Sequence, residues 1–314
     1  MNSYVCGLMK RALLHMHLAV ILWGFTGVLG RAITLSAPVL VWYRMLFTFL
    51  IMGGILTMRQ LWVKVERKDL GNLFVIGCLI SLHWVAFYAA IKFANVSIAL
   101  VCLSTASIFT SLLDPLVNKG KHDLGEVLLG LLAIAGVYLI YRFQEFYGKG
   151  IAAGIVAAIL SSAFTVLNKR IAHKYPSRTM VFYEMLSGWG FLTLLIPVFL
   201  WLMPGAALVP AGNSGWPGSD WIWLAVLSLC CTVWAQSLAL SALKKLSSFT
   251  VTLSVNLEPV YGILLAFLCY HENKELIFAA DGGLNWGFLT GMGLILLSVV
   301  LQMNRLLAPS GARA

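Results

Sequence analysis

The sequence predicts an all-α integral membrane protein with ten transmembrane helices, arranged as two inverted five-helix repeats. Two observations lead to this fold class: the composition is very apolar, and short motifs of the first half recur in the second. Of the 314 residues, 60% are hydrophobic and only 11% are charged, whereas a soluble domain has about half apolar and a quarter charged residues. The apolar residues also form blocks of about twenty, the length of a helix that crosses a bilayer. The lipid bilayer is therefore the first predicted partner.

Ten apolar segments can be marked as spans, and most connections between them are short, so consecutive helices are expected to be antiparallel neighbours. Two connections are longer, a Gly/Pro-rich segment at 204–220 and a polar segment at 271–284. The first span is too long for the apolar core of a typical signal peptide, so we expect it to be retained. The predicted spans are 12–33, 38–58, 70–91, 96–117, 124–141, 150–168, 179–203, 219–243, 248–270 and 285–304.

The basic residues predict which side of the membrane each connection faces. Sixteen of the 22 Lys and Arg residues fall in one set of connections, five fall in the other set, and Arg44 lies inside a span. Positive residues are enriched in cytoplasmic connections. We therefore expect a multi-pass protein of the inner membrane with both termini in the cytoplasm. The net charge of +10 is then an insertion signal, and no nucleic acid is expected as a partner.

Short motifs recur between the halves at an offset that rises along the chain. Because each half has five spans, an odd number, the second copy must enter the membrane from the opposite side. Inverted repeats with a site at their interface are typical of secondary transporters. This predicts two repeats, at 1–143 and 144–314. The matches pair Phe25-Thr26 and Arg31 with Phe164-Thr165 and Arg170 at 139, Tyr43 with Tyr183 at 140, Ala90-Ile91-Lys92 with Ala242-Leu243-Lys244 at 152, and Gly130 with Gly291 at 161.

Arg44 is the one charged residue of the apolar run 38–58, and Glu184 follows in the matching motif of the second half. A lone cation in hydrocarbon costs about 2.5–3.5 kcal/mol on insertion scales, so Arg44 needs a counter-charge, carbonyl groups or a wet cavity. We expect a substrate cavity, in which Arg44 attracts an anionic group and Tyr43 lies beside it. The alternative is a structural arginine remote from any substrate. Glu184 is a candidate for proton coupling, or for a side chain that snorkels to the cytoplasm.

The pair Glu258-Pro259 is expected near the middle of the ninth span. Proline has no N–H to donate, so it frees the carbonyl of Val255 and should kink the helix. A carboxylate in lipid is costly, which leaves Glu258 paired, hydrated or protonated. We expect Glu258 to meet an amine of the substrate or to carry a coupling proton, with Pro259 at a gating kink. A structural hydrogen bond to a neighbouring helix is the alternative.

Aromatic and amide side chains of other spans are candidates for the cavity wall. Trp84 and Tyr88 lie on one face of the third span, and Trp234 and Gln236 lie in the eighth. Trp23, in the first span, is a candidate gating residue. Each of these side chains could instead pack and hydrogen-bond at a helix interface, and Trp23 could belong to the aromatic belt.

Catalytic motifs are missing from the sequence. There is no Walker loop and no Gly-x-Ser-x-Gly, and the second histidine of a zincin helix does not follow His271-Glu272. The six cysteines fall mostly in apolar runs without metal-ligand spacing, so we interpret them as free thiols. The lone His83 is interpreted as structural. We therefore expect no enzyme, no cofactor and no metal.

Five short motifs resemble the EamA-like branch of the drug/metabolite transporter superfamily, and the resemblance covers almost the whole chain. It implies a ten-helix inverted-repeat carrier with a central cavity, often an exporter of amino acids or related metabolites. The chain differs from that family in its fourth span, where Ser104-Thr105 stand near a usual proline and Lys119 and Lys121 near a usual acid. The motifs are Leu22-Trp23-Gly24, Arg44, Ala90-Ile91, Leu257-Glu258-Pro259 and Glu272.

The function expected from all these features is secondary transport of small metabolites such as amino acids by alternating access, as an exporter. Arg44 and Glu258 would contact the substrate, and Trp84, Tyr88 and Trp234 would wall the cavity. One alternative is a carrier of phosphorylated or sugar-linked metabolites, for which one buried arginine is the support. An integral-membrane enzyme, or a scaffold without transport activity, would belong to a different class of protein. The sequence does not specify the substrate, the coupling ion or an oligomeric state.

Overall fold

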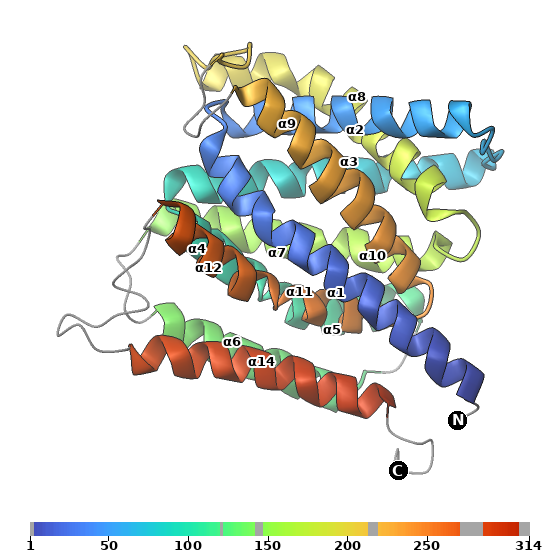
Figure 1. The fold of residues 1–314 in the computed structure, drawn as a ribbon, viewed down its shortest axis with the longest axis vertical. Coiled ribbons are helices and arrows are strands. Elements are labelled where there is room, and N and C mark those ends of the chain that lie inside the picture. The colour runs from blue at the N-terminus through green and yellow to red at the C-terminus, as the bar shows by residue number, and fades with distance from the viewer. Residues whose placement is uncertain (1–2, 120–121, 142–146, 213–218, 271–284, 308–314) are drawn as a thin grey trace.

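The computed structural model describes residues 3–119, 122–141, 147–212, 219–270 and 285–307, and every regular element in them is a helix. Figure 1 shows these helices as one bundle, with the beginning of α1 and the end of α14 on the same side. The helices are α1 (Ser3–Ala32), α2 (Ala37–Met58), α3 (Arg67–Phe93), α4 (Val96–Leu103), α5 (Ala106–Asn118), α6 (Leu124–Tyr141), α7 (Gly148–Ile171), α8 (Ser177–Leu202), α9 (Asp220–Ser228), η1 (Leu229–Trp234), α10 (Ala235–Leu243), α11 (Ser248–Val255), α12 (Glu258–Tyr270) and α14 (Trp286–Leu307).

Nine helical segments in the described part of the chain are long and apolar enough to cross a membrane, and residues Leu124–Gly136 of α6 form a shorter apolar helix. Together they occupy the ten predicted spans, and most boundaries differ by no more than three residues. The main difference is the start of α1 at Ser3 instead of residue 12, because the helix continues through Lys10 and Arg11 on the N-terminal side of the predicted span.

The fourth and ninth spans are each broken in the middle. The fourth divides into α4 and α5 at Ser104–Thr105, and the ninth divides into α11 and α12 at Asn256–Leu257. The two breaks lie 152 residues apart, which is the offset that the sequence gives for the preceding lysine motifs. The N-caps of α4 and α11, Asn95 and Ser247, are also 152 residues apart. The Asn95 side chain accepts from Ile98 N at 2.8 Å, and the Ser247 side chain accepts from Thr250 N at 3.1 Å.

The break in the fourth span was not predicted, because no proline causes it. The Thr105 hydroxyl donates to the Cys102 carbonyl at 2.7 Å, and the Ser104 hydroxyl donates to the Leu100 carbonyl at 3.3 Å. Such hydroxyls compete with the backbone N–H groups for helix carbonyls and loosen the turn. In the ninth span, Pro259 is the second residue of α12, where the missing N–H of proline is tolerated.

The eighth span contains a π-helical turn, η1, between α9 and α10. Turns of this kind are rare and often lie at functional sites. Here η1 directs the carbonyl of Cys231 toward side chains of α1 and α2, because that carbonyl accepts hydrogen bonds from Trp23 and Arg44.

Glycines set the closest helix crossings. α3 packs against α7 and α8, and α8 also packs against α2. A Cβ at Gly188 of α8 would lie 2.6 Å from the Gly77 carbonyl oxygen of α3. α6 and α14 pack on each other at Gly136 and Gly291, along the edge of the bundle farthest from α2 and α8 in Figure 1. The interior of the bundle holds the candidate functional site.

Candidate functional site

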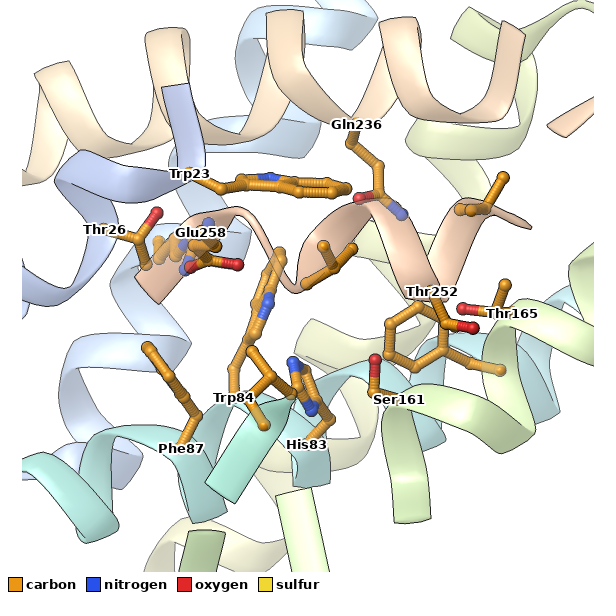
Figure 2. A pocket seen from close by; sticks show the side chains of 15 residues that line it. Trp23, Thr26, His83, Trp84, Phe87, Ser161, Thr165, Gln236, Thr252 and Glu258 are labelled. Atoms are coloured by element: carbon orange, nitrogen blue, oxygen red, sulfur yellow. The ribbon is translucent and has the colours of Figure 1, made fainter. Parts of the chain in front are cut away.

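A small cavity of about 70 Å³ lies at the breaks of the fourth and ninth spans. Leu103 and Val255, the last residues of α4 and α11, line it directly before each break. Figure 2 shows Trp23, Thr26 and Glu258 at one end, and Ser161, Thr165 and Thr252 at the other. The full lining is Trp23, Thr26, Arg44, His83, Trp84, Phe87, Leu103, Ser161, Phe164, Thr165, Gln236, Val251, Thr252, Val255 and Glu258.

Three pairs of lining residues lie at the offsets found in the sequence. Thr26 of α1 and Thr165 of α7 are 139 residues apart. The other pairs lie at 152, the offset of the broken spans: Trp84 with Gln236, and Leu103 with Val255. Equivalent positions of the two halves therefore face one cavity.

Arg44 is 1% exposed, and its guanidinium is held on several sides. Its Nε donates to Thr232 Oγ1 at 2.8 Å, Nη1 donates to Tyr88 Oη at 2.8 Å, and Nη2 donates to the Cys231 carbonyl at 3.2 Å. Its Cζ lies 3.9 Å from the centroid of the Trp84 ring, a cation–π geometry. Among the described residues no carboxylate forms an ion pair with Arg44. The N–H donors of Arg44 therefore bind residues of the cavity wall. Its positive charge, which no carboxylate among the described residues neutralises by an ion pair, still contributes to the electrostatic potential in the cavity.

Glu258 faces the cavity from the first position of α12. Its side chain is 4% exposed, and none of the hydrogen bonds among the described residues reaches its carboxylate. A buried carboxyl without a protein partner needs a proton, water or a ligand. Glu258 and Arg44 thus place an ionisable acid and a cation on one small cavity.

His83 contributes a neutral polar group to the wall. Its Nδ1 lies 2.7 Å from the Ala157 carbonyl oxygen, which can only accept, so Nδ1 carries the proton. Nε2 is then an acceptor on a ring that lines the cavity. The ring of Phe164 meets the His83 ring edge-on, with centroids 5.3 Å apart. The structural interpretation of His83 accounts for Nδ1, and no hydrogen bond among the described residues reaches Nε2.

Two predicted site residues lie behind the wall. Tyr88 is fully buried, accepts from Arg44 and packs against Phe87, so it contacts two lining residues without lining the cavity itself. Glu184 is also fully buried, next to Asn168 and Gln236, and neither of its oxygens has a well-formed hydrogen bond with a described residue. Of these neighbours, Gln236 lines the cavity.

Three other predicted residues lie outside the cavity lining. Trp234 is 53% exposed and lies beside Leu18 on the outer surface. It is two residues from Gln236, which lines the cavity, and residues two apart on a helix point in nearly opposite directions. Tyr43 packs edge-on against Trp221, with ring centroids 5.6 Å apart. Pro259 follows Glu258 without lining the cavity.

Several lining residues were not predicted as site residues. In the sequence, Thr26, Phe164 and Thr165 indicate only the repeat. Their recurrence in both halves is the sequence feature that could have identified them as site residues. Ser161 and Thr252 are ordinary helical residues in the sequence, and only the fold brings them together. In the described residues no group of His, Cys, Asp or Glu could hold a metal ion.

The helices are those of a multi-pass membrane protein. The model of the EamA-like transporter family matches residues 10–142 and 148–303. The chain belongs to this family, as the sequence motifs predicted, and it is therefore a transporter and not an enzyme.

Two curated relatives are similar to the chain. An "Uncharacterized transporter" of Archaeoglobus fulgidus is 27% identical over 249 residues, covering 76% of this chain and 82% of the relative. The "Riboflavin transporter ImpX" of Fusobacterium nucleatum is 25% identical over 185 residues, covering 54% and 62%. A solved structure, described only as "Crystal structure of protein", has a TM-score of 0.68 at 17% identity and covers 93% of this chain and 96% of its own. At that identity it supports the fold alone.

Proposed function

We propose that the chain is a secondary transporter that exports small metabolites such as amino acids by alternating access. In this proposal the repeats 1–143 and 144–314 rock about the cavity, in the inner membrane, with both termini in the cytoplasm. The observation that carries the proposal is the cavity between the two halves, lined by residue pairs at the repeat offsets. The broken helices at each side support it, because transporters place their sites where helices are interrupted.

The charges of the cavity support a solute with a cationic group. Glu258 is the one acid that lines the cavity, and it has no hydrogen-bond partner among the described residues. In contrast, three donor nitrogens of Arg44 already bind protein acceptors. We therefore assign the amine of the solute to Glu258 and a longer-range attraction of its carboxylate to Arg44. The rings of Trp23 and Trp84 would cover the apolar part of the solute.

Proton coupling is assigned to Glu258 first and to Glu184 second. Glu258 can exchange a proton for a cationic solute at one position, which is the simplest form of coupled export. Glu184 lies behind Gln236, and no cation among the described residues pairs with it. In this proposal Glu184 holds a proton, and its protonation state affects the neighbouring Gln236 side chain, which lines the cavity. Both are carboxyls buried in the bundle interior, a placement that is costly and usually functional in membranes.

A planar ring solute is the second candidate, since one relative is named a riboflavin transporter. The aromatic side chains of the wall, Trp23, Trp84 and Phe87, favour it. The cavity of about 70 Å³ favours the amino-acid-sized solute instead, because pockets for drug-sized ligands have roughly 300–1,000 Å³. No observation favours phosphorylated solutes, because Arg44 is the single cation of the wall in the described part of the chain.

The test is a screen for export from cells that overproduce the chain, with amino acids, amines and riboflavin as solutes, at several pH values. Trp84→Ala should abolish export of the true substrate. Trp234→Ala is the matched control, because it removes the same side chain from the outer surface. Export that Trp234→Ala loses and Trp84→Ala keeps would show that the substrate path lies elsewhere.

A further inference from the structure

Two buried aspartates occupy equivalent places near the two ends of the bundle. Asp69 lies in the first turn of α3 and is 1% exposed, and Asp220 is the first residue of α9 and is 0% exposed. They begin the third and eighth spans and lie 151 residues apart. Because five crossings separate these spans, the aspartates lie at opposite ends of the bundle. Neither aspartate belongs to the cavity lining.

Asp69 binds the connection between α7 and α8, which belongs to the other half of the chain. Its Oδ2 accepts from Tyr175 Oη at 2.8 Å and from Lys174 Nζ at 2.9 Å. Lys174 also reaches Oδ1 at 3.1 Å. The first half is thereby fastened to the second at this end by an ion pair and a phenol.

Asp220 repeats this arrangement at the opposite end with the halves exchanged. It binds the connection between α1 and α2, where the Thr34 hydroxyl donates to Oδ2 at 2.6 Å and the Thr34 N–H donates to Oδ1 at 3.1 Å. The N–H of Ala211, which precedes α9, donates to Oδ2 at 3.1 Å. The donors at this end are neutral, so the contact across the halves carries no ion pair between these described residues.

Two lysines at equivalent positions hold the same connections from within their own half. Lys92 donates to the Ile33 carbonyl at 2.7 Å, and Lys244 donates to the Tyr175 carbonyl at 2.9 Å. If the two halves rock apart, the lysine contacts can stay intact because each joins residues of one half. The contacts of Asp69 with the α7–α8 connection and of Asp220 with Thr34 must break, because they join residues of different halves.

We infer that Asp69 and Asp220 are the two gate latches of the transport cycle, each of which releases when its own end of the cavity opens. This inference rests on the alternating access proposed above. The latches are unlike in chemistry. The hydrogen bond with Asp69 raises the pKa of Lys174 above its ordinary 10.5. Lys174 therefore keeps its charge below that pH and loses it only as the pH rises through the raised pKa, so at neutral pH the lysine of this latch is charged.

The test measures from which side the cavity can be reached. In a chain without native cysteines, Ser161→Cys reports on the cavity, and a membrane-impermeant maleimide is applied to inside-out and to right-side-out vesicles. Asp69→Asn should speed labelling from one side by about tenfold, and Asp220→Asn should speed it from the other side by about tenfold. Tyr175→Phe and Thr34→Val each remove one hydroxyl from a latch, and they should shift labelling in the same direction as the corresponding aspartate variant.

Lys92→Met and Lys244→Met are the comparison variants. They loosen the connections that carry Thr34 and Tyr175 without removing a contact between the halves, so they should shift the sidedness of labelling less than the aspartate variants do. The inference is overturned if both aspartate variants speed labelling from the same side. It is also overturned if the parent chain is labelled from both sides and neither aspartate variant changes the labelling. A third contrary outcome is that the lysine variants shift labelling as much as the aspartate variants do. A reporter that no variant and neither side can label would overturn alternating access itself. Size-exclusion profiles show whether each variant is folded. If an aspartate variant is not folded, the corresponding hydroxyl variant, Tyr175→Phe or Thr34→Val, tests that latch instead.

Discussion

Trp23 and Arg44 donate to the same carbonyl oxygen, that of Cys231 in the π-helical turn, at 3.1 Å and 3.2 Å. The two side chains come from α1 and α2, so this one acceptor ties both helices to the eighth span. The relationship gives Arg44 a positioning role: it holds η1, Tyr88 and the ring of Trp84 in the arrangement that forms the cavity wall.

Arg44→Ala should abolish transport and destabilise the protein by about 1–3 kcal/mol, because the buried oxygens of Tyr88, Thr232 and Cys231 each lose a donor. Arg44→Lys should keep some transport, since lysine retains the charge but not the forked geometry. Thermal unfolding in detergent, measured beside transport, separates the two effects. Full transport by a well-folded Arg44→Ala variant would rule out any role of the charge at the site.

Glu258→Gln separates a coupling acid from a structural one. Glutamine has nearly the same shape and hydrogen-bonding reach but cannot ionise. For a coupling residue, the variant should lose transport driven by an imposed pH gradient and retain some exchange of solute for solute. The measurement is uptake into vesicles with and without that gradient. pH-driven transport at the level of the parent chain would end the proton hypothesis for Glu258, and Glu184→Gln would then be tested in the same way.

Membrane insertion leaves a strong record in sequence, which is why the ten spans could be predicted to within a few residues. The broken ninth span could be predicted too, because Pro259 has no N–H. The break at Ser104–Thr105 could not, since hydroxyl groups that bond to the backbone are common in intact helices as well.

The site was harder to predict than the fold, because it depends on which face of each helix turns inward. Trp84 and Gln236 were predicted to line the cavity and do lie in it, whereas Trp234, two residues from Gln236, faces outward. Residues two apart on a helix do not share a face, so Trp234 cannot line the cavity if Gln236 does. The contacts of Asp69 and Asp220 with the opposite half could not be foreseen, since they join residues 105 to 186 positions apart in sequence.

Orientation is checked with single cysteines at two exposed positions in a cysteine-free chain. Val209→Cys follows α8, where the side chain of Val209 is 67% exposed, and Lys64→Cys precedes α3. In intact cells an impermeant maleimide should label Val209→Cys, and it should label Lys64→Cys only after permeabilisation, because basic connections stay in the cytoplasm. The predicted connection at 271–284 lies outside the described residues. The reverse pattern would place both termini outside.

The last prediction concerns the crossing of α6 and α14, which pack on each other at glycines. A Cβ at Gly136 would lie 2.5 Å from the Gly291 carbonyl oxygen and 3.0 Å from a side-chain carbon of Ile295. Because a backbone atom cannot yield as a flexible side chain does, Gly136→Ala should force the helices apart and cost about 1–3 kcal/mol of stability.

Gly293→Ala, on α14, is the matched control for this crossing, because a Cβ at Gly293 has nothing within 4 Å. It should be neutral or stabilise the helix by up to about 1 kcal/mol, since alanine favours helix over glycine. Thermal unfolding of both variants in one detergent gives the comparison. If Gly136→Ala unfolds at the same temperature as Gly293→Ala, α6 and α14 do not cross as closely as described.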